Sequence, residues 1–369
     1  MSRAILFVLP SLGGGGAERV VINIINHLNR ERWTPVLAVC SGKGILSDLI
    51  ADDVDVHYFH KVKVRKALPA LILLIHKLKP DILFSTLTHL NLAVGLIRPF
   101  LPRRIRYIAR EGNLPERSLA GESHPFLYKV AYRFLYTGFD AVVAQSRRMK
   151  LNMQSYNRIP DELIHVIHNP VDTQVVMEGA AKERPEWPGV GIRLLAAGRL
   201  SHQKGFDVLL HTLKGIPGPF SLVLLGEGEE RVQLEALATK LGLEERVHFI
   251  GFDPNPYRWM AAADLFILSS RYEGFPNVLL EAVSCGLPVT AVTGDTSAQE
   301  IVVDGINGTL SHEPTVESLR SAVIRAMDIK WNNDRIREMA AENFSVSSIV
   351  KDYETLFERM IQKSKWKSE

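Results

Sequence analysis

The chain has 369 residues, which is enough for two domains of ordinary size with full cores. Hydrophobic residues make up 46% and charged residues 23%, the composition of a soluble globular protein. The net charge of +3 hides an asymmetry, because residues 1–185 carry +9 (25 Lys and Arg against 16 Asp and Glu) and the remainder carries −6. We therefore expect the basic half to meet an anionic partner or surface.

The sequence gives no sign of disulfides, of a cysteine metal site or of a membrane span. Its two cysteines, Cys40 and Cys285, lie in apolar contexts in opposite halves. The longest uninterrupted apolar run, 67–75, has nine residues, far short of the roughly 20 that cross a bilayer. Residues 1–10 lack a small-x-small cleavage site and predict a first strand rather than a signal peptide. A cytoplasmic location is expected.

A glycine-rich loop follows the first predicted strand. A strand is predicted over 4–9, followed by Gly13–Gly16 and a helix over 17–28. Glycines let the backbone approach a ligand closely, and a helix start favours anions. A dinucleotide fingerprint would need an acidic residue near the end of the second strand, but residues 35–40 lead into Ser41-Gly-Lys-Gly44. NAD binding is therefore not expected.

The first half continues as alternating strands and helices, which predicts a parallel sheet covered by helices on both faces. Strands are expected over 36–40, 54–59, 82–85, 106–109 and 141–145, with helices near 47–51, 69–78, 90–100 and 125–136. Ligands of such sheets bind beyond the carboxyl ends of the strands. Two of these ends are polar, Thr86–His89 and Arg110–Asn113. We expect Arg110 and Asn113 to hold hydroxyl and phosphate groups of acceptor or donor.

Two basic clusters lie beside apolar segments in this half, at Lys61, Lys63, Arg65 and Lys66 and at Arg98, Arg103, Arg104 and Arg106. Cations interleaved with apolar residues suit an anionic membrane surface. One hypothesis is peripheral membrane contact near a lipid-linked acceptor. The alternative, a solvated basic face, stays open. Nucleic acid is not an expected partner, because no recognised binding motif is present.

The second half begins after a linker rich in proline, glycine and charge. We expect an N-terminal domain over 1–178, the linker over 179–191, a second domain over 192–345, and a C-terminal segment over 346–369 with a frayed tail. A strand over 193–197 leads into a loop with Arg199 and Lys204, which can reach one diphosphate from different sides. Such a cationic pair neutralises the charge of a leaving group without a metal.

A second candidate site lies at 271–281. A strand over 264–269 is followed by a turn shaped by Gly274 and Pro276 and by a helix over 278–285, with Asn277 as its expected N-cap. A helix start of this kind suits a phosphate or diphosphate. Glu273 before the helix and Glu281 one turn inside it then border the ligand. An anion beside two carboxylates indicates a hydroxyl-rich ligand, such as a sugar nucleotide.

This stretch resembles the donor-site signature of retaining glycosyltransferases with the GT-B fold, with family 4 as the best match. The likeness rests on two glutamates separated by seven residues, the Gly-Phe-Pro-Asn between them, and Ala282–Val289 after them. Gly-Gly-Ala-Glu-Arg19 and His168–Asp172 also match the family's usual pattern. The resemblance implies two Rossmann-like parallel-sheet domains facing a cleft, with the C-terminal helix packing back on the first domain.

The resemblance also implies residue roles. Glu273, Arg199 and Lys204 would be catalytic, with Glu273 holding the donor sugar and the two cations the diphosphate. Glu281 would hold the ribose hydroxyls and Phe252 would lie by the base. Gly15, Gly16, Asn277, Val278 and Leu279 would complete the donor site. Family members commonly carry a histidine where this chain has Arg110-Glu-Gly-Asn113, so His89 and His124 are the candidates to replace it.

The implied reaction is transfer of a sugar from a nucleotide donor, expected to be UDP-linked, to a hydroxyl of a lipid-linked or cell-surface glycan with retention of configuration. That makes the chain a hexosyl- or N-acetylhexosaminyltransferase (EC 2.4) that needs no cofactor or metal. Asp53-Val-Asp55 mimics a metal-binding Asp-x-Asp but lies at a strand start in the first domain. Two alternatives stay open: a nucleotide-sugar epimerase of the same architecture, and a non-catalytic nucleotide-sugar-binding protein.

Overall fold

The computed structural model describes residues 2–116 and 124–365. The chain divides into two compact units, the first made of Met1–Pro170 with Val346–Glu369 and the second of Val171–Ser345. The division falls after Pro170, ahead of the linker expected over 179–191. The four residues 366–369, in the tail that we expected to fray, lie outside the described residues.

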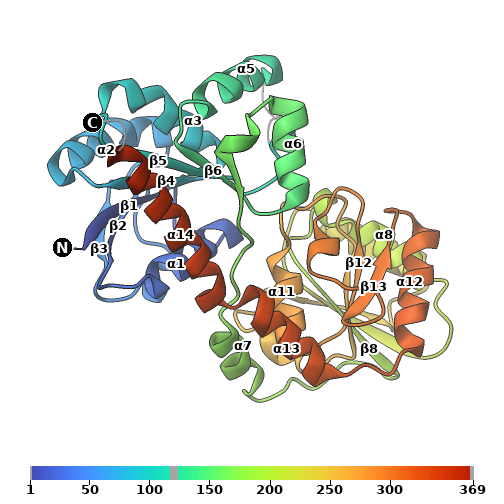
Figure 1. The fold of residues 1–369 in the computed structure, drawn as a ribbon. Helices are drawn as coiled ribbons and strands as arrows, with labels where there is room; N and C mark the ends of the chain where they lie inside the picture. Colours follow the sequence, from blue (N-terminus) through green and yellow to red (C-terminus); the bar gives the residue numbers. More distant parts are fainter. Residues whose placement is uncertain (1, 117–123, 366–369) are drawn as a thin grey trace. The chain divides into compact units, whose positions relative to one another are not determined.

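The first unit is built on one sheet of seven parallel strands in the order β3-β2-β1-β4-β5-β6-β7. Figure 1 labels the first six of these strands. The side chains of β1 alternate between two buried layers, with Ile5 and Phe7 on one face of the sheet and Leu6 and Val8 on the other. A sheet buried on both faces is what the strand–helix alternation predicts. Its strands are β1 (Arg3–Leu9), β2 (Trp33–Val39), β3 (Asp55–Tyr58), β4 (Ile82–Thr86), β5 (Arg106–Arg110), β6 (Ala141–Ala144) and β7 (Ile164–Val166).

Two groups of helices cover this sheet. One face packs α1 (Gly16–His27) and α14 (Val346–Lys365), and the other packs α2 (Val64–Leu78), α3 (Thr88–Ile97), α5 (Pro125–Tyr136) and α6 (Arg147–Asn157). Helix α2 begins at Val64, five residues before the expected start near Pro69. A proline there removes only one helical hydrogen bond, and the buried Ala67, Leu71 and Ile75 hold the helix against the sheet. Among its described residues the unit also has three short 3₁₀ turns, η1 (Ser47–Leu49), η2 (Arg98–Phe100) and η3 (Asp161–Leu163).

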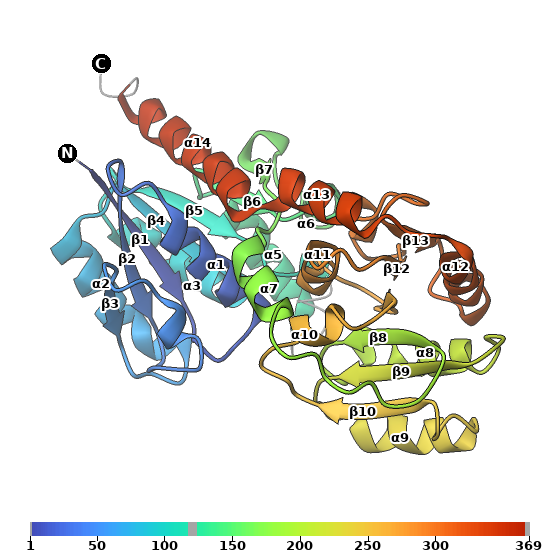
Figure 2. The same ribbon diagram turned by 90° about the horizontal axis from the view of Figure 1, so that it is seen from below.

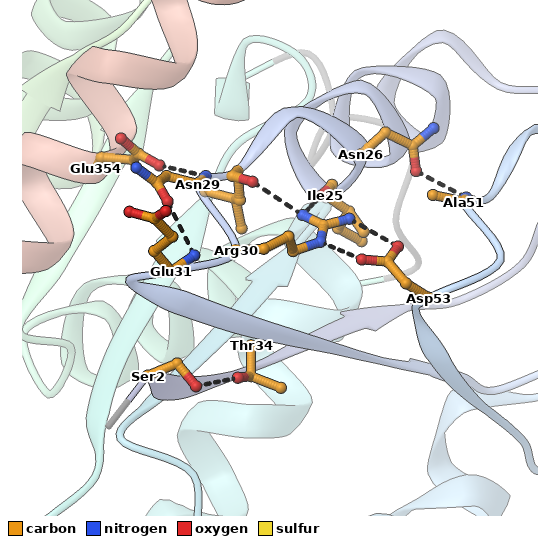
Figure 3. Close-up of polar contacts among 11 residues, drawn as sticks. Ser2, Ile25, Asn26, Asn29, Arg30, Glu31, Thr34, Ala51, Asp53 and Glu354 are labelled. Atoms are coloured by element: carbon orange, nitrogen blue, oxygen red, sulfur yellow. Dashed lines mark hydrogen bonds and ion pairs between the residues drawn. The ribbon is translucent and has the colours of Figure 1, made fainter.

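Helix α14 belongs to the first unit although the chain reaches it only after the second. Its Tyr353 and Phe357 are fully buried, and the Phe357 ring lies 5.6 Å from the Trp33 ring in an edge-on contact. The Glu354 carboxylate also accepts a hydrogen bond of 2.7 Å from the backbone N–H of Asn29 (Figure 3). Burial of the helix's apolar stripe therefore fixes the chain's return to the first sheet.

The second unit has a six-stranded parallel sheet in the order β10-β9-β8-β11-β12-β13 (Figure 2). The order along the chain reverses between β8 and β11, so this is the topological switch point of a doubly wound fold. The strands are β8 (Ile192–Ala197), β9 (Phe220–Leu225), β10 (Val247–Gly251), β11 (Leu265–Leu268), β12 (Val289–Val292) and β13 (Gly308–Ser311). The helices are α7 (Thr173–Ala180), α8 (Phe206–Leu213), α9 (Arg231–Lys240), α10 (Tyr257–Met260), α11 (Asn277–Ser284), α12 (Val316–Asp328) and α13 (Asn333–Phe344), with 3₁₀ turns η4 (His202–Lys204) and η5 (Ala298–Glu300).

Helix α7 explains why the division falls after Pro170. Val171 and Val176 are buried in the same apolar cluster as Tyr257 and Leu279 of the second unit. The amide of Asn255 also donates a 3.0 Å hydrogen bond to the carbonyl at the end of α7. Residues 171–178, which the sequence assigned to the first domain, therefore pack with the second.

Neither cysteine is in a disulfide. Burial raises the pKa of Cys40 to about 11 and that of Cys285 to about 12, so both thiols stay protonated at neutral pH. Across residues 2–116 and 124–365, none of the helices combines the length and the apolar character that a bilayer crossing requires.

Candidate functional site

Two loops of the second unit meet at the switch point of its sheet. The loop 198–205 follows β8 and the loop 269–276 follows β11. Because β8 and β11 are paired parallel neighbours, with Leu194 opposite Leu265, both loops leave the same edge of the sheet. Arg199, Lys204 and Glu273, the three residues predicted to be catalytic, lie on these two loops, and this edge is where doubly wound sheets bind ligands.

Hydrogen bonds join the two loops directly. The backbone N–H of Arg271 donates to the carbonyl of Gln203 at 2.8 Å, and the Gln203 amide donates to the carbonyl of Tyr272 at 3.1 Å. The hydroxyl of Ser269 donates to the carbonyl of Lys204 at 2.9 Å. The two loops therefore form one framework, and a shift in either displaces the other.

Lys204 and Glu273 are in direct contact at the centre of this framework. The Lys204 ammonium lies 2.6 Å from Oε1 of Glu273, and the same oxygen accepts a 2.8 Å hydrogen bond from Ser270. The two side chains are only 19% and 11% exposed, so the pair is shielded from most solvent screening. The structure thus brings together two of the three residues predicted to be catalytic.

Arg199, the third of these residues, lies on the same loop as Lys204 but is exposed. Within residues 2–116 and 124–365 its guanidinium has neither an ion-pair partner nor a hydrogen-bond acceptor. Five donors in a planar fork remain available for a diphosphate or another anion.

The base of the framework is held by Gly205 and by an ion pair. Gly205 has φ +63° at the start of α8, and a Cβ there would collide with the carbonyl oxygen of Ser269. Arg271 binds both carboxylate oxygens of Asp207, at 2.8 and 2.7 Å. This hydrogen-bonded ion pair lowers the pKa of Asp207.

Helix α11 differs from expectation at its first residue. Asn277 was expected to be the N-cap, but it is the first helical residue; Pro276 occupies the cap position, and the cap makes no side-chain hydrogen bond. The extended backbone of Pro276 (φ −77°, ψ 97°) already ends the turn, so Asn277 takes helical geometry. The helix still begins on the loop that carries Glu273, four residues after it.

The other predicted residues of this helix occupy different environments. The N–H of Leu279 donates to the carbonyl of Pro276 at 3.0 Å, and its side chain is fully buried in the core. Val278 is half-buried, as is Glu281 one turn into the helix. Phe252 directly follows β10, and its side chain is 70% exposed.

A third loop, after β12, supports Glu273 from the other side. The backbone N–H of Glu273 donates to the carbonyl of Asp295 at 3.1 Å, and the hydroxyl of Ser297 donates to the carbonyl of Gly274 at 2.8 Å. Ser297 is fully buried. The loops after β8 and β12 therefore fix the backbone on both sides of Glu273.

In the first unit, Gly15 and Gly16 form the start of α1. Gly15 is the N-cap and Gly16 the first helical residue, and both are exposed. A Cβ at Gly15 would collide with the carboxylate of Glu18, which folds back toward it from the third helical position. The glycine therefore makes room for a buried carboxylate at the helix start.

Arg110 is committed to neighbours inside the first unit. It is completely buried, and its three nitrogens lie 3.3 Å from Tyr353 Oη, 3.3 Å from Thr86 Oγ1 and 2.6 Å from Asn169 Oδ1. It ties β5 to α14. Asn113, by contrast, is half-buried, and its side-chain oxygen accepts a 2.8 Å hydrogen bond from the N–H of Leu114.

Glu111 lies at the end of β5, completely buried among polar side chains. It accepts a hydrogen bond of 2.8 Å from Thr88 and another from Tyr136, and the Asn91 amide lies 3.3 Å away. Burial raises the pKa of Glu111. Leu87 precedes this group with φ +73°, a strained value for a leucine.

The two histidines are both exposed. His89 is the second residue of α3, next to Thr88, and His124 is the N-cap of α5. His89 therefore lies at the carboxyl edge of the first sheet, next to Thr88, which binds Glu111. His124 lies elsewhere, at the start of α5.

The acidic pair of Asp53-Val-Asp55 is engaged by side chains. Asp53 binds Arg30 through both oxygens, at 2.5 and 3.1 Å (Figure 3), and Asp55 lies 3.0 Å from His57. The arginine lowers the pKa of Asp53. Among the described residues no group of three or more His, Cys, Asp or Glu has the arrangement of a metal site.

Sequence reasoning missed several residues of this framework. Ser270, three residues before Glu273, was a detectable signal because a hydroxyl so close in sequence can reach the carboxylate. No sequence signal pointed to Asp207, because its partner Arg271 is 64 residues away. Glu111 was noticed but given no role, because nothing in the sequence shows that it is buried.

Comparison with known families gives two matches that together span most of the chain. Residues 14–175 match the model of "Glycosyltransferase Family 4", and residues 179–343 match that of "Glycosyl transferases group 1". The first covers the glycine loop, and the second covers all of the loops around Glu273.

Individual relatives agree with these models. The chain is 26% identical over 318 residues to the N-acetylgalactosamine-N,N'-diacetylbacillosaminyl-diphospho-undecaprenol 4-alpha-N-acetylgalactosaminyltransferase of Campylobacter jejuni, covering 81% of this chain and 83% of that protein. It is 25% identical to the lipopolysaccharide core biosynthesis glycosyltransferase LpsD of Rhizobium meliloti, covering 95% and 96%. Among solved structures, HepE of Anabaena in complex with UDP has a TM-score of 0.77 at 22% identity, covering 96% of this chain and 99% of HepE.

Proposed function

Because the chain belongs to family 4 of the glycosyltransferases, with the GT-B fold, we propose that it transfers a sugar from a UDP-linked donor to a hydroxyl acceptor with retention of anomeric configuration. The observation that carries the proposal is the Lys204–Glu273 pair at the switch point of the second sheet, with the exposed guanidinium of Arg199 on the same loop. A cationic pair and a carboxylate on one edge match a diphosphate joined to a sugar.

The proposed roles follow from charge and position. Arg199 and Lys204 bind the diphosphate and stabilise the charge that it gains as it leaves. Lys204 then exchanges a contact with Glu273 for one with phosphate, which frees the carboxylate to accept hydrogen bonds from sugar hydroxyls. Glu281, one turn into α11, accepts hydrogen bonds from the ribose.

Retention is proposed to occur by front-face departure. The bond between the anomeric carbon and the diphosphate oxygen breaks, and its electron pair stays with the phosphate. The acceptor oxygen forms the new bond on the same face and passes its proton to the departing diphosphate. This route needs no carboxylate nucleophile, and none was evident in the sequence.

Two similarities support the donor and acceptor classes. HepE, with the same fold, was solved with UDP and with UDP-glucose, which supports a UDP-linked donor. The Campylobacter relative is named for a diphospho-undecaprenol acceptor, which supports a lipid-linked or cell-surface glycan. We propose that the chain works at the inner face of a membrane, which its basic first unit contacts.

A panel of nucleotide sugars tests the donor. A ligand that binds only the folded protein raises its melting temperature. At a ligand concentration of a hundred times Kd, the free energy of unfolding increases by about 2.7 kcal/mol. We expect UDP and one UDP-sugar to stabilise the chain and the other nucleotides to have smaller effects. A chain that no nucleotide stabilises would not be the proposed enzyme.

Product analysis separates the remaining alternatives. A transferase releases UDP in step with acceptor glycosylation, and NMR of the product gives its anomeric configuration. An epimerase converts the donor without an acceptor, and a binding protein leaves it intact. Either of the last two results, obtained with the stabilising donor and a range of acceptors, would reject the proposal.

A further inference from the structure

The backbone is fixed immediately before, at and after Glu273. The carbonyl just before this residue accepts a 3.1 Å hydrogen bond from the Gln203 amide, and the N–H of Glu273 donates to the carbonyl of Asp295 at 3.1 Å. The carbonyl just after it accepts a 2.8 Å hydrogen bond from the hydroxyl of Ser297. Because the backbone is held in this way, the direction of the carboxylate depends on the contacts of its two oxygens.

The two carboxylate oxygens of Glu273 have different surroundings. Oε1 lies 2.6 Å from the Lys204 ammonium and accepts a 2.8 Å hydrogen bond from the hydroxyl of Ser270. Oε2, over the described ranges 2–116 and 124–365, has no hydrogen-bond or ion-pair partner. Water reaches little of this side chain, which is 11% exposed, and an acceptor left unpaired in such a place is costly. A ligand hydroxyl that donates to Oε2 would remove this cost.

Ser270 holds Oε1 more rigidly than Lys204 does. Ser270 is 1% exposed, and a single side-chain torsion sets the position of its hydroxyl oxygen. The lysine reaches the same carboxylate oxygen through a flexible four-carbon stem. In the proposed function Lys204 leaves Oε1 for the diphosphate, and Ser270 then remains as the partner of Oε1.

We propose that Ser270 is a positioning residue: its hydroxyl anchors Oε1 of Glu273 and thereby directs Oε2 toward the hydroxyls of the donor sugar. The inference rests on the proposed function, because it needs a sugar nucleotide in the site. It goes further by giving the two oxygens different tasks, with Oε1 bound to the protein and Oε2 bound to the sugar. A carboxylate that could turn about its last bond would lose part of its affinity in being ordered when the sugar binds.

Two other serines of the second unit are matched controls. Ser269 is 2% exposed, and its hydroxyl donates a 2.9 Å hydrogen bond to the backbone carbonyl of Lys204. Ser284, in α11, is 1% exposed, and its hydroxyl has no hydrogen-bond partner among the described residues. Alanine at each of the three positions removes one buried hydroxyl, but only the hydroxyl of Ser270 contacts the Glu273 carboxylate.

Calorimetric titration of the full chain tests the proposal, with UDP and with UDP-glucose, UDP-galactose, UDP-N-acetylglucosamine and UDP-N-acetylgalactosamine. The quantity to compare is the ratio of Kd for UDP to Kd for the UDP-sugar that the original chain binds most tightly. Ser270→Ala should lower this ratio by about three- to tenfold, the effect of losing one hydrogen bond. Kd for UDP itself should not change, because UDP carries no donor sugar. Ser269→Ala and Ser284→Ala should leave the ratio unchanged.

A second variant covers the case in which Ser270→Ala does not fold. Ser270→Cys keeps a side chain of similar size, but its thiol donates only weakly. It should lower the ratio in the same direction as Ser270→Ala. An unchanged ratio in a folded variant at this position would overturn the proposal.

A double variant separates positioning from a general structural role. Ser270→Ala and Ser269→Ala each remove a buried hydrogen bond of similar length, so the melting temperature should fall to a similar extent in both. In a Glu273→Ala background, the addition of Ser270→Ala should not change the ratio further, because the carboxylate through which the serine acts is absent. A further loss in that background, or an equal loss of the ratio in Ser269→Ala, would show that Ser270 only supports the loop.

The same titrations distinguish failure of this inference from failure of the proposed function. A chain that binds none of the five nucleotides is not the proposed enzyme, and the inference falls with it. Binding of UDP but of no UDP-sugar overturns the inference, while product analysis decides the proposed function. Binding of a UDP-sugar with the same ratio in the original chain and in Ser270→Ala rejects only the role of Ser270.

Discussion

The Lys204 ammonium lies 2.6 Å from the Glu273 carboxylate, although the two residues lie on loops that follow different strands of the sheet and are 69 positions apart. The same oxygen is held by Ser270 at 2.8 Å. The pair keeps both charges compensated before the donor arrives. In the proposed function, the two opposite charges serve different parts of one ligand, with Lys204 at the diphosphate and Glu273 at the sugar hydroxyls.

The costs of removing Lys204 and Glu273 should not be additive. Lys204→Met or Glu273→Gln leaves its partner partly buried without compensation, at a cost of about 1–3 kcal/mol. The double variant should cost less than the sum of the two. Urea denaturation gives the coupling, and the more exposed Arg193–Asp264 pair, at 40% and 41%, is the control, with an expected coupling of about 0–1 kcal/mol. Additive costs at Lys204 and Glu273 would contradict the pairing.

Arg199→Ala should separate catalysis from stability. The side chain is exposed, so the free energy of unfolding should change by less than about 0.5 kcal/mol. Loss of a cation on the leaving diphosphate should lower kcat by about 10²-fold or more. Steady-state kinetics with the stabilising donor measure this, and Lys182→Ala serves as the control. An unchanged kcat in Arg199→Ala would remove this residue from the site.

Glu281→Ala should act on donor binding instead. The proposed ribose contacts are the same in the ground state and the transition state, so their loss should raise KM for the donor by about tenfold or more with little change in kcat. Glu244→Ala, at an exposed position of the same unit, should leave both constants unchanged. A fall in kcat at constant KM would instead place Glu281 at the reacting centre.

Gly205→Ala tests the contact between the two loops. An added Cβ meets the Ser269 carbonyl and the backbone has φ +63°, so the variant should lose about 2–4 kcal/mol and much of its activity. Gly242→Ala has a similar φ of +70° but nothing within 4 Å, so it should lose only about 1 kcal/mol and stay active. Thermal melts compare the two. Equal losses would show that backbone strain, and not the loop contact, sets the cost.

The Arg271–Asp207 pair predicts a pH dependence. The pKa of Asp207 is lowered in the folded chain, so its ionised form stabilises the fold at pH values above the unfolded pKa of about 3.9. That contribution is lost as the pH falls through the lower folded pKa. The stability difference between the original chain and Asp207→Asn should be constant from pH 7 to about 5 and shrink in acid. Because Asp207 is 41% exposed, we expect less than about 1 kcal/mol. A difference that grows in acid would contradict the pairing.

The fold could be predicted from the sequence because its signals are local. The apolar strands of residues 4–9 and 82–85, each followed by a helix, predict parallel pairing wherever they lie in the chain. The two carboxylates around Gly-Phe-Pro-Asn and the cations after β8 were recognisable for the same reason, since each motif lies within a dozen residues.

Contacts between distant segments could not be predicted in this way. Arg110 is polar and at a strand end, which suggests a ligand, yet its nitrogens bind Tyr353, Asn169 and Thr86. Pro276 displaced Asn277 from the N-cap because the turn geometry before it decides where the helix starts. The place of residues 171–178 was set by apolar contacts with residues about 80 and 100 positions later.

By itself, the sequence determined the strand–helix alternation, the motifs at the strand ends and the distribution of charge, because periodicity and composition act over neighbouring residues. Only the tertiary structure decided which of those side chains meet. The partner of Lys204 and the burial of Arg110 and Glu111 depend on how the strands are ordered in the sheets and on which helix faces they cover. Burial and charge pairing are properties of segments brought together in space, and no local pattern encodes them.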